Sequence, residues 1–365
     1  MRVLIAAGGT AGHVFPGLAV AARLRDRHGA EVRFVGRAGG QEASMVPAAG
    51  FALATVEARP FQRRLSLGAV RAPLTALRAS RRVRGMLRGA DVAVGMGGYA
   101  SVPLALAARH ERVPLVLHEQ NVVPGLANRL AGRWARVVAL SFAEAGSRLP
   151  RRTRTIVTGN PIRDAILEVR DHRASLAAIA IEAFGLASDR RTVVVFGGSQ
   201  GALHLNETLV GAARFLADRD DLQILVLTGR AHHETVSRRM PPTAGLLVRT
   251  RPFVERMELA YAAADLIVSR SGAGTIAELT ACGLPALLVP YPYATARHQE
   301  ANARALVRAG GASMLLDDQL APRLLAERIE SMLDPQRLKA MREMSERFGR
   351  PDAADALADL IAGSA

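Results

Sequence analysis

Short apolar runs alternate with helical stretches along the whole chain. They occupy residues 2–7, 31–36, 91–96, 114–119, 137–141 and 155–158, and then residues 192–196, 223–227, 246–248, 266–269 and 286–289. Runs of this kind are typical of strands buried in parallel sheets whose helices form right-handed crossovers. Because 365 residues usually form two domains, the pattern predicts an α/β protein with two doubly wound, Rossmann-like domains that face a cleft.

The joint between the domains is predicted after Pro161, where a charged stretch runs to Arg173. This gives domains of residues 1–162 and 163–342. No run approaches eighteen apolar residues, and the N-terminus begins with a strand-like segment without the features of a signal peptide. We therefore expect a chain that stays in the cytoplasm and does not span a membrane.

The net charge of +15 is confined to the first half of the chain. Residues 1–162 contain 24 arginines and 8 acidic residues, an excess of 16, whereas residues 163–365 contain 24 basic and 25 acidic residues. This asymmetry predicts an anionic partner for the first domain. Nucleic acid is disfavoured as that partner, because only 4% of the residues are aromatic and none is interleaved with the basic residues.

Residues 61–88 contain no acidic residue and combine arginines with leucines and valines at roughly helical spacing. The residues that define this acceptor or membrane side are Leu74, Leu77, Arg78, Arg81 and Arg82, with Tyr99 from a later turn. One interpretation is a core-packed helix with a solvated arginine face. The other, favoured by the charge of this half, is a basic amphipathic segment that contacts an anionic membrane surface.

Small or polar residues follow several predicted strands of the first domain. Residues 8–13, GGTAGH, form a tight turn that ends at His13, and residues 118–121, HEQN, end another strand. Because strand ends of this type face a ligand, His13 is a candidate general base, with Glu119 as a second candidate. Asn121 is suited to binding sugar hydroxyls.

The second domain has two further glycine turns, at residues 197–202 and 271–274. The second opens a helix that carries Glu278, and three interpretations compete there. It is a glycine turn of geometry alone, a dinucleotide site, or a site for a nucleotide-sugar diphosphate on the helix N-terminus. The following strand lacks the acidic residue that would bind a dinucleotide ribose, which disfavours the second interpretation.

Two acidic pairs offer little for metal chemistry. Asp218 and Asp220 precede their strand and so lie at the wrong end of the sheet, and Asp317 and Asp318 begin a turn. We interpret both pairs as solvated loop residues and predict no obligatory metal or cofactor.

Eight blocks in order resemble the MurG family of UDP-N-acetylglucosamine transferases, which form lipid II from lipid I. They are GGTAGH (8–13), GGQE (39–42), GGYAS (97–101), HEQN (118–121), GNPIR (159–163), GGSQGA (197–202), SRSGAGTIAE (269–278) and HQEANA (298–303). The resemblance spans nearly the whole chain. It implies the GT-B glycosyltransferase fold, with residues from about 343 to 365 crossing back onto the first domain.

The resemblance also implies roles for individual residues. Uracil would meet the backbone at Val254, and ribose would meet Glu278. The residues implied for the diphosphate and the acetamido sugar are Ser199, Ala273, Gly274, Thr275, Arg163, Arg270, Asn121, Gln299, His298, Asn302, Thr10, Ala11 and Gly12. Ala11 stands where the family more often has glycine, and His298 stands where some members have glutamine.

The resemblance, which agrees with the interpretation of the residues, implies an inverting, metal-independent transferase that moves GlcNAc from UDP-GlcNAc to the 4-hydroxyl of MurNAc in lipid I, for peptidoglycan synthesis. His13 or Glu119 would act as the base. The enzyme would lie peripherally on the cytoplasmic side of the cell membrane and contact other cell-wall synthesis proteins. The alternatives are another GT-B transferase with a glycolipid or small acceptor, a UDP-GlcNAc epimerase, a dinucleotide-dependent oxidoreductase and a non-catalytic nucleotide-sugar sensor.

Overall fold

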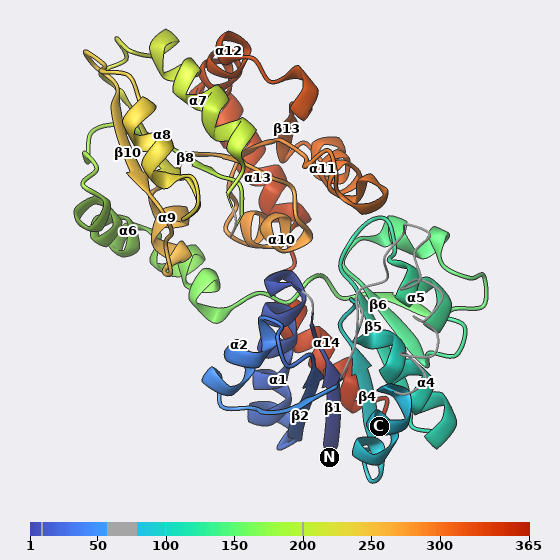
Figure 1. Ribbon diagram of the computed structural model, residues 1–365. Coiled ribbons are helices and arrows are strands. Elements are labelled where there is room, and N and C mark those ends of the chain that lie inside the picture. Colours follow the sequence, from blue (N-terminus) through green and yellow to red (C-terminus); the bar gives the residue numbers. More distant parts are fainter. Residues whose placement is uncertain (9, 57–78, 99, 199–200) are drawn as a thin grey trace, which may run out of the picture. The chain divides into compact units, whose positions relative to one another are not determined.

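The computed structural model describes residues 1–365 except 9, 57–78, 99, 199 and 200 (Figure 1). The chain forms two compact units. Unit 1 comprises Met1–Arg163 and Arg350–Ala365, and unit 2 comprises Asp164–Gly349.

Unit 1 is built on a seven-stranded parallel sheet with the order β3-β2-β1-β4-β5-β6-β7. Its strands are β1 (Arg2–Ala6), β2 (Glu31–Gly36), β3 (Ala52–Thr55), β4 (Val92–Gly95), β5 (Leu115–Glu119), β6 (Val137–Leu140) and β7 (Thr155–Val157). Its helices are α1 (Ala11–His28), α2 (Glu42–Ala48), α4 (Ser101–Glu111), α5 (Leu126–Ala131), the 3-10 helix η1 (Ala143–Arg148) and α14 (Ala353–Ala362). Residues 79–87 are also helical.

Side chains of β1 point alternately into two apolar layers. Val3 and Ile5 lie in the layer that includes residues of α1 and α14, whereas Leu4 and Ala6 lie in the layer that includes residues of α4. Because both faces of the sheet are covered, its central strands β1, β4, β5 and β6 are buried along almost their whole length, as the sequence pattern predicted.

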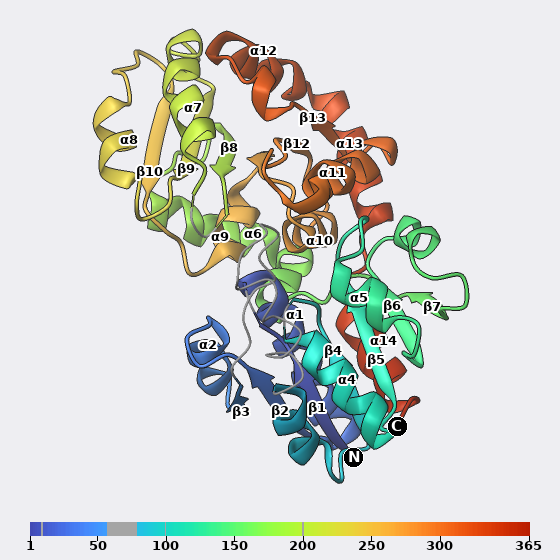
Figure 2. The ribbon, with the colours of Figure 1, turned by 45° about the vertical axis from the view of Figure 1, so that its right-hand side comes forward.

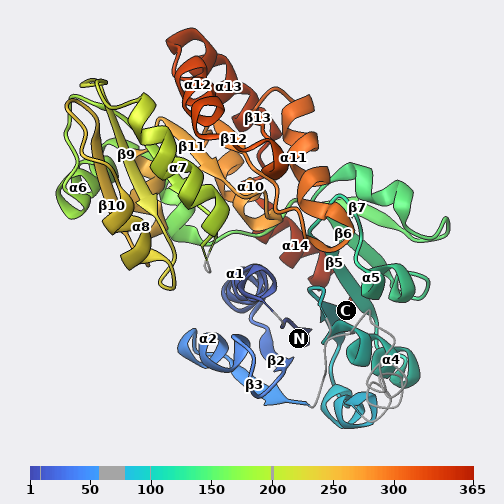
Figure 3. The ribbon, with the colours of Figure 1, turned by 45° about the horizontal axis from the view of Figure 1, so that its top comes forward.

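Unit 2 repeats this architecture with a six-stranded parallel sheet of order β10-β9-β8-β11-β12-β13. Its strands are β8 (Arg191–Phe196), β9 (Leu222–Leu227), β10 (Leu247–Arg251), β11 (Leu266–Ser269), β12 (Ala286–Leu288) and β13 (Ala312–Met314). Its helices are α6 (Asp164–Phe184), α7 (Leu203–Phe215), α8 (His233–Arg239), α9 (Met257–Ala263), α10 (Ala273–Ala281), α11 (His298–Arg308), α12 (Pro322–Met332) and α13 (Pro335–Phe348), with 3-10 helices η2 (Thr295–Arg297) and η3 (Asp317–Gln319). Helix α12 packs on α7, and α13 packs on α10 (Figure 3).

The last helix, α14, belongs to unit 1 and packs against α1 (Figure 2). Its Leu357 and Ile361 are fully buried there, and Asp355 Oδ1 accepts a hydrogen bond from Arg27 Nη1 at 2.7 Å. The chain returns to unit 1 at Arg350 rather than near residue 343, because α13 stays on unit 2. There the hydroxyl of the buried Ser345 donates to Leu284 O at 3.3 Å.

Among the described residues, no helix combines the length and the apolar character that crossing a bilayer requires.

Candidate functional site

In each sheet the strand order reverses beside the first strand of the unit. β1 lies between β2 and β4, and β8 lies between β9 and β11. Ligands of doubly wound folds bind beyond the carboxyl ends of the strands at such switch points. The glycine turns after β1, β4, β8 and β11 therefore lie at the edges where binding is expected.

His13 lies in the first turn of α1, directly after the turn that follows β1. Its Nδ1 is 3.0 Å from the hydroxyl oxygen of Thr10, and its backbone N–H donates to Thr10 O at 3.0 Å. Its other ring nitrogen lies against Gly97, where an added Cβ would come within 3.1 Å of Nε2. Thr10 therefore fixes the orientation of the imidazole, and Gly97 leaves space for it. Ala11 and Gly12 complete this first turn.

The turns after β1 and β4 touch each other. Gly98 has a φ of 73°, and a Cβ there would lie 2.5 Å from Gly8 O, so only glycine fits without displacing the backbone. The hydroxyl of Ser101 donates to Gly97 O at 2.8 Å and accepts from Gly97 N at 3.0 Å, which holds the second turn in place. Tyr99, a predicted acceptor-side residue, lies outside the described residues.

Glu119 ends β5 with its carboxylate almost completely buried. Oε1 accepts from Asn121 N at 3.0 Å, while Oε2 accepts from Gly125 N at 3.0 Å and from Asn128 Nδ2 at 2.8 Å. Burial raises the pKa of the Glu119 carboxyl, and the hydrogen bonds from these three residues oppose that rise. Both carboxylate oxygens of Glu119 accept hydrogen bonds, two of them from backbone N–H groups of residues 121–125. Glu119 therefore holds this loop in place.

Asn128, which the sequence pattern did not single out, contacts the candidate base Glu119. It is buried in α5, where its amide nitrogen donates to His118 O at 2.9 Å as well as to Glu119. A lone asparagine in the otherwise apolar or basic run LANRLA was the available signal. Its partners come from a neighbouring strand, which sequence spacing does not reveal.

His118 is fully buried beneath the same loop. Its Nε2 donates to Gly159 O at 3.0 Å, and its Nδ1 has no hydrogen-bond partner within the described part of the chain. Burial lowers the pKa of His118 from 6.5 to about 4, so the ring is neutral at physiological pH. It connects β5 to the GNPIR segment at the end of unit 1.

Arg163 lies on the aromatic ring of Phe15, with its guanidinium carbon 4.6 Å from the ring centroid. Phe15 follows His13 by two positions in α1. The structure therefore places Arg163 beside the helix that carries His13, and its predicted position near a diphosphate remains a prediction.

In unit 2, α10 begins directly after the turn that follows β11. Gly272 is its N-cap residue, and Ala273, Gly274 and Thr275 form a first turn without acidic side chains. Free N–H groups and the helix dipole favour an anion at such a position. The turn after β8 contains Gly201, whose φ of 78° and closeness to Thr228 O require glycine. Ser199 of that turn lies outside the described residues.

Glu278 lies one turn further along α10 and is partly exposed. Its Oε2 accepts a hydrogen bond at 2.8 Å from the hydroxyl of Tyr261, a fully buried residue of α9. This contact fixes the orientation of the carboxylate. A carboxylate that accepts hydrogen bonds from ribose hydroxyls needs such a fixed orientation. Val254 lies between β10 and α9 and is half-buried.

The HQEANA segment forms the start of α11, beside the same turn. Gln299 Oε1 accepts from Tyr291 N at 2.9 Å, and Gln299 O accepts from the hydroxyl of Ser271 at 2.9 Å. Asn302 Nδ2 donates to Ser271 O at 3.4 Å. His298 Nδ1 donates to Thr295 O at 2.8 Å, and burial lowers the pKa of His298.

Arg270 is buried, and its Nη1 donates to Val289 O, Pro290 O and Asp317 Oδ1. The prediction that Asp317 is a solvated loop residue is wrong, because its side chain is only 14% exposed and pairs with this arginine. The sequence did not reveal this ion pair, because Arg270 and Asp317 lie 47 residues apart. Asp218 and Asp220 are exposed, as predicted.

The predicted membrane segment is described only from residue 79 onward. Arg81 and Arg82 are exposed there, while Val83 and Leu87 are buried in the core of unit 1. Leu74, Leu77 and Arg78 lie outside the described residues. Within the ranges that the structure describes, no group of three or more His, Cys, Asp or Glu side chains could hold a metal ion.

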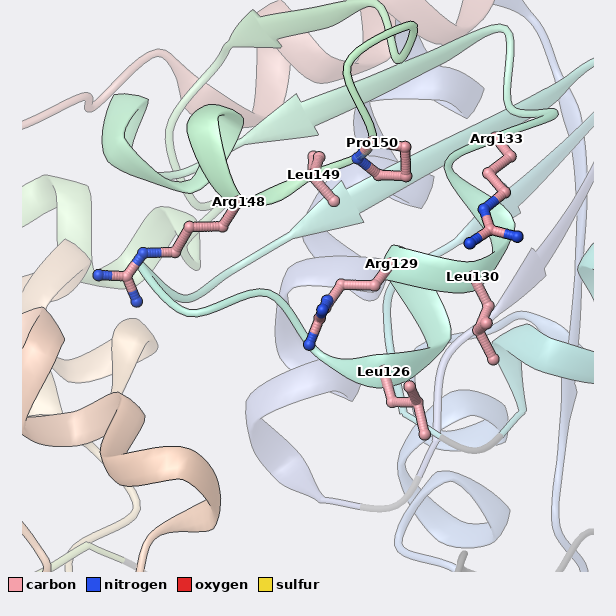
Figure 4. Close-up of a pocket in the computed structure, with 7 residues that line it drawn as sticks. All are labelled: Leu126, Arg129, Leu130, Arg133, Arg148, Leu149 and Pro150. Atoms are coloured by element: carbon pink, nitrogen blue, oxygen red, sulfur yellow. The ribbon is translucent and has the colours of Figure 1, made fainter.

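A basic and apolar cavity of about 330 Å³ opens on unit 1 between α5 and η1 (Figure 4). It is lined by Leu126, Arg129, Leu130, Arg133, Arg148, Leu149 and Pro150. Leu126 is 54% exposed and Leu130 is 43% exposed, so both leucines of this short helix present apolar surface to solvent. We call these seven residues the α5–η1 surface.

Comparisons with known proteins agree with this arrangement. Residues 3–140 match the glycosyltransferase family 28 N-terminal domain, and residues 192–357 match the family's C-terminal domain. A Halothermothrix orenii protein named UDP-N-acetylglucosamine--N-acetylmuramyl-(pentapeptide) pyrophosphoryl-undecaprenol N-acetylglucosamine transferase is 39% identical over 100% of this chain and 99% of its own. A protein of the same name from Anaeromyxobacter dehalogenans is 41% identical over 99% of this chain and 92% of its own.

Solved structures confirm the predicted GT-B fold. The crystal structure of Acinetobacter baumannii MurG matches with a TM-score of 0.81 and 30% identity over 99% of both chains. A UDP-GlcNAc 2-epimerase from Neisseria meningitidis matches with a TM-score of 0.70 over 100% of both chains, but its 12% identity shows a shared fold alone. The full-length identity to the named transferases and the two matched domains show that this chain belongs to the MurG family of N-acetylglucosamine transferases.

Proposed function

We propose that the protein transfers GlcNAc from UDP-GlcNAc to the 4-hydroxyl of MurNAc in lipid I, forming lipid II for peptidoglycan synthesis. The full-length similarity to transferases named for this reaction supports the substrates. In the reaction, the acceptor oxygen forms a bond to the anomeric carbon of GlcNAc. The bond from that carbon to the β-phosphate oxygen breaks, and UDP leaves with the electron pair. A single in-line displacement of this kind inverts the anomeric centre.

The observation that carries the mechanism is the pair of Thr10 and His13. With Nδ1 held by the threonine hydroxyl at 3.0 Å, the imidazole has a fixed orientation at a strand's carboxyl end. We assign His13 as the base that takes the proton of the acceptor's 4-hydroxyl. An oriented histidine with a second ring nitrogen is suited to this step.

Glu119 is then a positioning residue rather than the base. Its carboxylate already accepts three hydrogen bonds, two of them from backbone N–H groups of the loop that begins at Asn121. The loop would present Asn121 to the sugar, and Asn128 would hold Glu119 from beneath.

The donor would bind to unit 2. Uracil would lie at the backbone of Val254, ribose at Glu278, and the diphosphate at Ser199 and the first turn of α10 at Ala273 to Thr275. Gln299, with His298 and Asn302, would contact the acetamido sugar. The contacts of Glu278 with Tyr261 and of Gln299 with Tyr291 N support these roles, because each fixes a side chain that would otherwise rotate.

The protein would contact the cytoplasmic face of the cell membrane peripherally, where its lipid-linked acceptor lies. The α5–η1 surface supports this proposal, since it combines three arginines with exposed leucines and includes no acidic residue. Arginines attract anionic lipid headgroups, and leucines bury their side chains at the acyl boundary.

The decisive experiment is UDP release from UDP-GlcNAc in vesicles, with and without a lipid I analogue. Release that needs the acceptor and yields a β-1,4-linked disaccharide is expected, and His13→Ala should lower kcat by about a hundredfold or more. Glu119→Gln keeps an acceptor oxygen and should retain more activity than His13→Ala. Release without acceptor would instead indicate an epimerase or hydrolase, and UDP-GlcNAc binding without turnover would indicate a sensor.

A further inference from the structure

Asp317 joins two segments of unit 2 that lie far apart in the sequence. Its Oδ1 accepts from Nη1 of Arg270 at 2.5 Å, and its Oδ2 lies 3.0 Å from Nδ1 of His204. These partners are 47 and 113 residues away. With its side chain 14% exposed, one carboxylate contacts two polar side chains from two separate elements.

The first partner controls the start of α10. Arg270 directly precedes the turn at Ser271 and Gly272, and the same Nη1 donates to Val289 O at 3.2 Å and to Pro290 O at 3.1 Å. Its guanidinium carbon lies 5.6 Å from the centroid of the Tyr291 ring. Arg270 therefore holds the turn into α10 against the end of β12, and Asp317 supplies the one carboxylate that it contacts among the described residues.

The second partner controls the start of α7. His204 is the second residue of that helix, which begins after the glycine turn at residues 197–202. Its side chain is 51% exposed, so apolar packing contributes little to its placement. The carboxylate of Asp317 therefore bridges the first turn of α7 and the residue before the turn into α10.

We infer that Asp317 is a positioning residue that fixes the first turn of α7 relative to the first turn of α10 and thereby sets the affinity of unit 2 for a diphosphate. The inference rests on the proposed function, which places the donor's diphosphate at Ser199, shortly before α7, and at the first turn of α10. Two sets of backbone N–H groups can bind one diphosphate only at a fixed separation, because each hydrogen bond tolerates a few tenths of an ångström. In this inference Asp317 does not touch the ligand. It acts only by fixing this spacing, so it is not a catalytic residue.

The test compares UDP with uridine, which lacks the diphosphate. In full-length protein, Asp317→Asn should weaken UDP binding about tenfold while uridine binding stays unchanged, as measured by calorimetry or by competition. Asp318→Asn is the matched control, because it removes the same charge from the next, exposed residue and should leave both affinities unchanged. A merely structural role for Asp317 would instead lower the melting temperature and weaken both ligands equally.

Equal weakening of both ligands, or no change in either, would overturn the inference. If Asp317→Asn does not fold, the test uses His204→Ala, because alanine removes the hydrogen bond to Asp317 Oδ2 at a half-exposed position. It should weaken UDP about threefold relative to uridine, and an unchanged ratio would overturn the inference as well. Failure of the unaltered protein to bind UDP would contradict the proposed function itself, which separates the two failures.

Discussion

At the scale of single residues, the proposed mechanism depends most on the hydrogen bond between Thr10 and His13. Thr10→Val keeps the shape of the side chain but removes the hydroxyl from Nδ1. Since a hydrogen bond of this kind contributes about 1 kcal/mol, kcat should fall roughly fivefold to tenfold, with little change in the KM for UDP-GlcNAc. Steady-state kinetics checks this, and Thr10→Ser, which keeps the hydroxyl, should retain most of the activity. Equal kcat values for the valine and serine variants would contradict the assigned role.

His118 gives the folded protein a measurable pH dependence. Its folded pKa of about 4 lies below the ordinary value of 6.5, so the unfolded chain binds more protons between these two pH values. The free energy of unfolding should therefore fall by up to about 3 kcal/mol as the pH drops from 6.5 to 4. Denaturant titrations of His118→Gln should lack this part of the fall.

His110→Gln is the matched control for that measurement, because His110 is exposed. Its unfolding free energy should follow that of the unaltered protein across the whole pH range. If the curve of His118→Gln also runs parallel to that of the unaltered protein, folding does not lower the pKa of His118, against the prediction.

Residues whose role depends on local pattern were accessible from the sequence, and residues whose role depends on distant partners were not. His13 follows a glycine turn directly after an apolar run, so its place at the sheet edge could be predicted. Asp317 and Asn128 make their important contacts with segments that only the folded chain brings near. An acidic residue in a loop and an amide in a short helix look the same whether solvated or bound.

At the scale of elements, the contact between the turns after β1 and β4 depends on glycine. Gly98→Ala would force alanine into a left-handed conformation and push against Gly8 O, so it should cost about 1–3 kcal/mol of unfolding free energy and separate the two turns. Activity should fall more than tenfold at temperatures where the variant is still folded. Circular dichroism melts and UDP-release assays at one temperature test both effects.

Gly85→Ala serves as the control for that substitution. Gly85 lies within the helical residues 79–87, and no atom would lie within 4 Å of an added Cβ. Alanine there should raise the unfolding free energy by about 0.5–1 kcal/mol and leave activity unchanged. A loss of activity equal to that of Gly98→Ala would show that the position of Gly98 is not special.

The two strands that the sequence pattern did not predict are both at sheet edges. β3 reads ALAT and β13 reads ASM, and each stands at the end of its sheet among the described strands. An edge strand is less buried than a central one, so it does not need a long apolar run to be stable. The central strands of both sheets, by contrast, were predicted to within one residue at each end.

At the scale of the whole molecule, the α5–η1 surface and the basic first half predict salt-sensitive binding to anionic vesicles. The double variant Arg129→Glu with Arg133→Glu should lower the bound fraction in cosedimentation several-fold at low salt, since each basic residue near a bilayer contributes about 1 kcal/mol. The control is Arg214→Glu with Arg328→Glu, which changes the net charge equally at exposed positions of unit 2. Equal binding by the two double variants would remove the α5–η1 surface from the proposal.

The placement of α14 in unit 1 affects the order in which the two units can finish folding during synthesis. Leu357, Ala358 and Ile361 share an apolar layer with Val3 and Ile5, so the layer beside β1 is incomplete until α14 has been synthesised. Unit 2, whose residues are continuous from Asp164 to Gly349, can finish folding before then. Domains of a growing chain usually fold in order from the N-terminus. Unit 1 therefore begins before unit 2 in the chain but is completed after it, and the apolar side chains that α14 covers stay exposed until α14 has been synthesised.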